Sequence, residues 1–139
     1  MSTDTSSVTL VRNAIHNPGE PRHFMRVLPC PDVVVVRAGD VEIGRSARAT
    51  EVREVAYDIY PPVFYLPRDD LVMARLRANP RSTHCPLKGD TEYFDIVTDE
   101  GLIAEAAWSY VDVIERAAAL QGLVAFDTRK VEVSIERTR

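Results

Sequence analysis

The sequence contains little of what small proteins use to stabilise a fold with covalent bonds or a metal. It has two cysteines among its 139 residues, which is too few for a disulfide framework, and we expect free thiols. No Cys-x-x-Cys pair is present, and the spacing of Cys30, Cys85 and the histidines matches no recognised zinc site. A domain of this length buries roughly two-thirds of its unfolded surface without such help. The sequence therefore predicts no metal and no cofactor.

Basic residues are not in excess, and long apolar runs are missing. The formal net charge is −4, which argues against sequence-independent binding to nucleic acid or to an anionic membrane. No apolar run reaches the roughly 18 residues of a membrane-spanning helix. Residues 1–11 are polar, unlike the start of a secretory signal. We expect a cytoplasmic protein with no nucleic-acid and no membrane partner.

The patterns that are present are mostly those of β-strands. Residues 33–36 and 41–43 flank an Ala-Gly-Asp turn, which predicts a hairpin. Residues 93–97 and 102–106 predict a second hairpin around a turn that contains glycine. Further strands are predicted at residues 47–55, 63–66, 123–126 and 131–135. The sequence predicts a mainly β domain of about eight antiparallel strands.

One helix is predicted in the C-terminal half. Asp112 is a candidate N-cap, Glu115 follows three residues later, and Gly122 can end the helix in a left-handed conformation. The apolar residues between them would share one face that packs on the sheet. A shorter helical turn is expected within residues 69–76.

The first 25 residues are predicted to form an N-terminal arm or tail. The run at 17–21, Asn-Pro-Gly-Glu-Pro, cannot continue a helix or a central strand. A single domain is therefore placed at residues 26–139.

Charges are distributed unevenly along the chain. Residues 71–89 contain four basic side chains and no acidic one, whereas residues 90–115 contain eight acidic side chains and no basic one. Two interpretations stay open. The two segments can be solvated faces that partly neutralise each other. Alternatively, the basic segment, with His84 inside it, can form an anion-accepting rim, because arginine offers paired N–H donors to a phosphate or carboxylate.

Four segments carry a family likeness. They read PVFYLPRDDL at 62–71, THCPLKGD at 83–90, AAWSY at 106–110 and VAF at 124–126. In order and spacing these segments resemble the DUF427 family. The resemblance covers about residues 27–136. It implies a β-tent-like or sandwich fold, similar to that of the thalidomide-binding CULT domains, and a function that the family name leaves unknown.

The family is sometimes labelled a nucleotidyltransferase, and the residues give that label little support. Nucleotidyl transfer of the common type needs clustered carboxylates that hold metal ions at the phosphates. Here Asp69 and Asp70 are adjacent. In a strand they would point to opposite faces, and at the start of a helical turn one of them is more simply a cap.

Six residues in the segments of the resemblance are candidates for a ligand site in a pocket between sheets. The aromatic members would form apolar walls, and the basic members would orient a small polar or anionic ligand. The aromatic candidates are Tyr65, Tyr93 and Trp108, and the basic candidates are Arg68, His84 and Lys88. Structural roles are the alternative: Trp108 can anchor the core, and Arg68 can bridge segments.

Two other classes of function stay open. One is an enzyme that acts on a phosphate- or carboxylate-bearing substrate, with His84 as general acid–base and Lys88 stabilising charge. In such an enzyme Cys85 is a weak candidate nucleophile, because a reactive thiolate needs a nearby positive group. The alternative is that Cys85 is a buried structural cysteine. The other is a homo-oligomeric protein-interaction module whose edge strands pair with a second copy.

Overall fold

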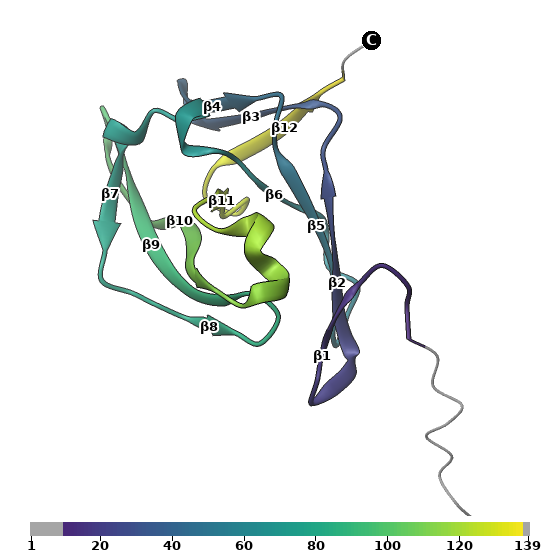
Figure 1. The fold of residues 1–139 in the computed structure, drawn as a ribbon. Helices are drawn as coiled ribbons and strands as arrows, with labels where there is room; N and C mark the ends of the chain where they lie inside the picture. Colours follow the sequence, from purple (N-terminus) through teal and green to yellow (C-terminus); the bar gives the residue numbers. More distant parts are fainter. Residues whose placement is uncertain (1–9, 138–139) are drawn as a thin grey trace, which may run out of the picture.

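The fold consists of twelve antiparallel strands in three sheets (Figure 1). The structure is a computed structural model that describes residues 10–137. The strands are β1 (Ile15–Asn17), β2 (Glu20–Pro29), β3 (Val33–Ala38), β4 (Val41–Ser46), β5 (Thr50–Val55), β6 (Val63–Tyr65), β7 (Leu76–Asn79), β8 (His84–Cys85), β9 (Gly89–Thr98), β10 (Gly101–Val113), β11 (Val124–Phe126) and β12 (Glu132–Glu136). The predicted mainly β, antiparallel fold is confirmed.

The three sheets differ in the number and order of their strands. The first has the order β1-β2-β5-β6, and the third has the order β12-β3-β4. The second has the order β11-β10-β9-β7, and β8 also pairs with β9. The β9–β10 hairpin is the longest pairing and places Trp108 beside Tyr93 and Ser109 beside Glu92. This register decides which side chains share a face.

The predicted strands are all present, and four strands lie outside the predicted set. The two predicted hairpins are β3–β4 and β9–β10, and the others correspond to β5, β6, β11 and β12. The additional strands are β1, β2, β7 and β8. They are short or carry prolines and charges, so they lack the apolar alternation of a half-buried strand.

The predicted domain start at residue 26 falls inside β2. The breakers at 17–21 lie at the turn between β1 and β2, where Asn17 pairs with Glu20. Met25, next to the boundary, is completely buried. Residues 15–17 and 20–25 of the predicted arm are therefore paired in a sheet, while residues 1–9 lie outside the described residues.

The predicted helix at 112–122 is wrong. Asp112 remains in β10, in register with Asp90, and so does not cap a helix. The segment that follows, η4 (Glu115–Leu120), consists of 3-10 turns interrupted at Ala117, and its first turn has no side-chain cap. The β10 strand continues because the backbone N–H of Ile114 donates to the carbonyl oxygen of Lys88 over 2.9 Å, which keeps this stretch beside β9.

Parts of the helix prediction are nevertheless visible in the structure. Ala117 and Leu120 are buried, as their apolar spacing suggested. Gly122 has a φ of +80°, the left-handed conformation expected at the end of the segment. The shorter predicted turn is present as two 3-10 turns, η2 (Arg68–Asp70) and η3 (Met73–Arg75).

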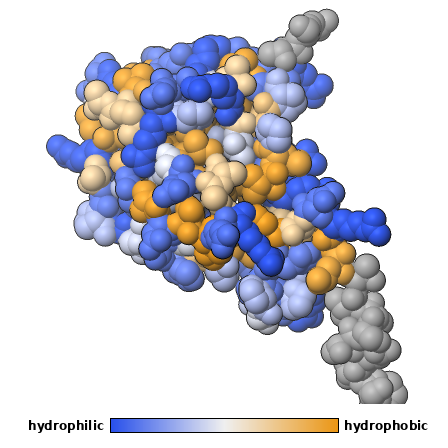
Figure 2. Space-filling view, viewed as in Figure 1, coloured by the Kyte–Doolittle hydropathy of each residue, from blue (hydrophilic) through white to orange (hydrophobic). Residues whose placement is uncertain are grey.

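The core consists of two groups of buried side chains. The larger joins the third sheet to β9 and β10, and the smaller contains Met25, Tyr65 and Tyr110 with Trp108 packed against it. On the face shown in Figure 2, hydrophobic side chains are interspersed with hydrophilic ones. Within residues 10–137, no helix is long and apolar enough to cross a membrane.

Oppositely charged side chains from the two charge-biased segments meet in the fold. Arg81 pairs with Glu105 over 2.5 Å and Arg75 with Asp99 over 3.3 Å. The two arginines flank β7, which pairs with β9 and so brings them to the β9–β10 hairpin. Partial neutralisation, the first of the two interpretations, therefore accounts for these residues.

Candidate functional site

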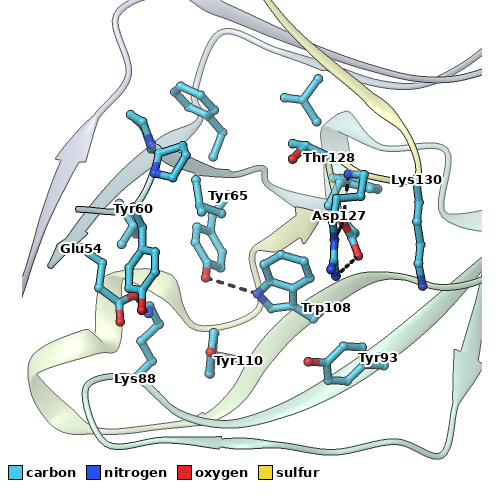
Figure 3. Close-up of a pocket in the computed structure, with 18 of the residues that line it drawn as sticks. Glu54, Tyr60, Tyr65, Lys88, Tyr93, Trp108, Tyr110, Asp127, Thr128 and Lys130 are labelled. Atoms are coloured by element: carbon cyan, nitrogen blue, oxygen red, sulfur yellow. Dashed lines mark hydrogen bonds and ion pairs between the residues drawn. The ribbon is translucent and has the colours of Figure 1, made fainter. Parts of the chain in front are cut away.

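A pocket of about 710 Å³ lies between the first and second sheets. One side consists of β5, β6 and the loop between them, and the other of β9, β10 and residues 126–130. Figure 3 shows Trp108 in the middle of this pocket, with Lys88 toward one end and Lys130 toward the other. We call these the Lys88 end and the Lys130 end.

Aromatic rings form much of the wall. The indole Nε1 of Trp108 donates a hydrogen bond to the hydroxyl oxygen of Tyr65 over 3.3 Å, which joins β10 to β6. The rings of Trp108 and Tyr93 are 6.4 Å apart between centroids, since the two residues are register partners on β10 and β9. Tyr110 follows two residues after Trp108 and therefore lies on the same face of β10. Tyr60, from the loop before β6, also lines the pocket.

The Lys88 end holds a chain of polar side chains. Lys88 is 6% exposed, and its Nζ lies 2.5 Å from Oε1 of Glu54. The other carboxylate oxygen of Glu54 lies 2.8 Å from Nε2 of His23, and Sγ of Cys85 is 3.8 Å from the Lys88 ammonium. Burial opposes the ionisation of Glu54, but Lys88 and His23 outweigh it, so the pKa of Glu54 is lowered. Glu54 is therefore anionic at neutral pH.

The Lys130 end is more open and carries three cations. The guanidinium of Arg81 lies over the ring of Tyr93, 4.8 Å from its centroid. Arg129 binds Asp127 through two contacts of 3.1 and 3.0 Å, and this hydrogen bonding lowers the pKa of the Asp127 carboxyl. Nζ of Lys130 instead donates to the backbone carbonyl oxygen of Ala104 over 2.7 Å.

Burial changes the acidity of two phenols in the wall. It raises the pKa values of Tyr65 and Tyr110 well above the ordinary value of 10, because an apolar environment disfavours the phenolate. Both hydroxyl groups therefore keep their protons across the physiological range.

Four of the six predicted ligand residues meet in this pocket. Tyr65, Lys88, Tyr93 and Trp108 all line it. They come from β6, the turn before β9, β9 itself and β10. The sequence prediction thus joined segments that the fold brings together.

Arg68 does not line the pocket. Its Nε donates to the carbonyl oxygen of Gly122 over 2.7 Å, and its Nη2 donates to Oγ of Ser109 over 3.1 Å. Successive side chains on a strand point to opposite faces, so Ser109 faces away from the side that carries Trp108. Arg68 consequently links η2 to β10 behind the pocket wall, which is the structural alternative considered for it.

His84 also lies outside the pocket, and its exposed side chain pairs with Asp90 through Nδ1 over 2.7 Å. Its neighbour Cys85 points the other way, toward Lys88. The acid–base group of the enzyme hypothesis is therefore absent from this pocket. Both cysteines are free: Cys30 is buried and Cys85 is partly buried.

Most of the charged residues of the pocket were not among the predicted candidates. They are Glu54, Arg81, Glu105, Asp127, Arg129 and Lys130. They come from strands and turns whose neighbours depend on sheet pairing. Tyr110 was also missed, although its spacing from Trp108 would identify it once residues 107–113 are treated as a strand. No group of three or more possible metal ligands occurs within the described part of the chain.

Comparison with known proteins gives the family. None of the curated proteins matches the chain. Residues 26–137 match the model of a family described as a domain of unknown function, DUF427. This span covers most of the chain and includes the pocket walls from β5 to residue 133. The protein therefore belongs to the DUF427 family.

Proposed function

We propose that the pocket binds a small molecule that combines a flat ring with an anionic group. The observation that carries this proposal is an aromatic wall next to a lysine that forms no direct ion pair among the described residues. Among residues 10–137, Lys130 has no carboxylate within ion-pair distance, and its ammonium contacts backbone carbonyl oxygens instead. Asp95 and Asp127 feel the charge of Lys130 only from beyond ion-pair distance, so an anionic group at this end would supply its direct partner.

The rings favour a flat partner. Tyr93 and Trp108 are tilted by 37° to each other, and Tyr65 fixes the indole by accepting its hydrogen bond. Apolar rings held in this way offer contact area without much loss of side-chain entropy when a ligand binds. The volume of about 710 Å³ lies within the usual range of small-molecule sites.

The charges favour an anion over a cation. Lys88 lies 5.8 Å from the ring centroid of Tyr110, and Arg81 lies 4.8 Å from that of Tyr93. Two of the rings are therefore already next to the protein's own cations, so a positively charged ligand would meet like charge there. The lining contains four basic side chains and three carboxylates, which leaves a small positive excess.

Binding is favoured over catalysis because His84, the acid–base candidate, lies outside the pocket. The test is calorimetric titration of the purified protein with three probes of one shape: 2-naphthoate, neutral 2-naphthamide and cationic 2-naphthylmethylammonium. We expect naphthoate to bind most tightly and the ammonium probe least tightly.

Substitution at the Lys130 end sharpens the test. Lys130→Ala is expected to weaken naphthoate binding about fivefold, the order of one partly exposed charge contact, and to leave naphthamide unchanged. Arg116→Ala removes an exposed cation on η4, outside the pocket, and serves as the control for net charge. Tighter binding of the ammonium probe, or no heat of binding with any probe, would refute the proposal.

A further inference from the structure

Two buried tyrosines from facing elements have hydroxyl groups in the pocket. Tyr65 comes from β6 and is 2% exposed, and Tyr110 comes from β10 and is 8% exposed. Both line the pocket, and their ring centroids are 6.3 Å apart. Figure 3 shows Tyr110 between Lys88 and Tyr93 in that view, on the same side of Trp108 as Tyr65.

The hydroxyl of Tyr110 makes no hydrogen bond with any residue in the described range 10–137, although the residue is only 8% exposed. It is not among the fully enclosed polar atoms of this range, so the hydroxyl is accessible from the cavity that Tyr110 lines. Because this hydroxyl belongs to the lining of a cavity, a molecule in the cavity can supply the missing acceptor.

Tyr65 is in a complementary position. Its oxygen accepts the hydrogen bond of the Trp108 indole, and no acceptor for its own proton occurs among the described residues. A hydroxyl carries one donor and two acceptor sites, so this proton remains available. The side chains of Tyr65 and Tyr110 thus place two unused O–H donors in one cavity.

The charge at this end decides which acceptor fits. The ammonium of Lys88 is already neutralised by Glu54, and the Glu54 carboxylate would repel a second anion nearby. The uncharged oxygen of a carbonyl accepts hydrogen bonds from phenols without that repulsion.

We infer that Tyr65 and Tyr110 form a donor subsite for an uncharged carbonyl oxygen of the ligand. This inference rests on the proposed function, because it places the oxygen on the same flat molecule whose anionic group lies at the Lys130 end. The ligand class is therefore a flat acid with a carbonyl group remote from its acidic group.

The experiment compares two uncharged probes, 2-acetylnaphthalene and 2-ethylnaphthalene, which differ in the carbonyl oxygen. Each is titrated against the wild-type protein, Tyr110→Phe and Tyr57→Phe. Tyr110→Phe removes one hydroxyl and keeps the ring, while Tyr57→Phe removes a hydroxyl from a fully exposed residue outside the pocket. Thermal unfolding of each variant verifies that it is folded.

We expect Tyr110→Phe to weaken 2-acetylnaphthalene binding about three- to tenfold, the value of one neutral hydrogen bond. Binding of 2-ethylnaphthalene is expected to be unchanged, and Tyr57→Phe is expected to affect the binding of neither probe. With a ¹³C-labelled carbonyl, the bound probe's resonance should lie further downfield in the wild type than in Tyr110→Phe, because hydrogen bonding deshields the carbonyl carbon.

Two results would overturn the inference and leave the proposed function intact. One is equal affinity of wild type and Tyr110→Phe for the acetyl probe. The other is an equal loss of affinity for both probes, which would mean that the substitution changed the shape of the pocket wall and did not remove a hydrogen bond. If the wild type binds neither these probes nor naphthoate, the proposed function fails together with the subsite.

Discussion

Replacing Glu54 by Gln tests the polar chain at the Lys88 end. The substitution removes the carboxylate that neutralises Lys88 and leaves an ammonium that is 6% exposed. The free energy of unfolding is expected to fall by about 3–5 kcal/mol, which is typical when one partner of a buried ion pair is lost. For a chain of this size, each kcal/mol lost lowers the midpoint of thermal unfolding by about 4 °C, so the midpoint would drop by roughly 12–20 °C.

The destabilisation should depend on pH in one direction. Burial raises the pKa of Glu54, but Lys88 and His23 lower it more, and the folded-state value lies below the ordinary 4.5. A carboxyl with a lowered pKa stabilises the folded state at every pH above its ordinary value. That contribution is lost as the pH falls through the folded-state pKa, so wild type and Glu54→Gln should converge in acid.

Urea unfolding followed by the fluorescence of Trp108, at pH 7 and at steps down to pH 3, measures both effects. Glu42→Gln is the matched control, since Glu42 also contacts two basic partners, Arg37 and Arg45, but on the surface. Its expected cost is about 0–1 kcal/mol. A Glu54→Gln cost below about 1 kcal/mol at pH 7, or a difference that grows in acid, would refute the reasoning.

Three further predictions concern Arg68, Gly89 and the two cysteines. Arg68→Met is expected to cost about 1–3 kcal/mol of stability, because it removes the bonds to Gly122 and Ser109, and to leave naphthoate affinity unchanged. Gly89→Ala should destabilise the fold strongly in urea unfolding, because Gly89 has a φ of +124° and a Cβ would overlap the backbone of the neighbouring strand. A thiol reagent should label Cys85 in the folded protein, and Cys30 only after denaturation, which mass spectrometry distinguishes.

The strands that the sequence predicts are those with strong apolar patterns and clear turns. The valine run of β3 and the turn between β9 and β10 are local features, and the structure confirms both. The β2 strand is different, because it begins with Glu20-Pro21 and alternates charged and apolar residues irregularly. It is a strand because β5 lies beside it, and a single sequence does not show that pairing.

The helix prediction failed for a similar reason. Asp112, Glu115 and Gly122 have the spacing of a capped helix, but β9 offers hydrogen-bond partners to the chain as far as Val113. Tertiary pairing therefore outweighed a local capping pattern. The segment that remained was only long enough for 3-10 turns.

The site could be predicted where its residues share a strand face or an apolar character. Trp108 and Tyr93 were assigned to one wall, and their register places them together. Arg68 was misplaced because it follows a strand end and its direction is set by a contact with Gly122, more than fifty residues away. Glu54 and Lys130 reach the pocket from elements that become neighbours only after the sheets assemble.

The composition of the Lys88 end supports the proposed ligand site. Replacing a buried ion pair by apolar side chains of similar volume is often neutral or stabilising, so such a pair is weak evidence of a stabilising role. Here Lys88 and Glu54 border a cavity and lie near two phenols whose protons have no acceptor among the described residues. Since a buried ion pair and two phenols with unused O–H donors occur at one end of one cavity, the proposed ligand recognition explains their placement better than stability alone does.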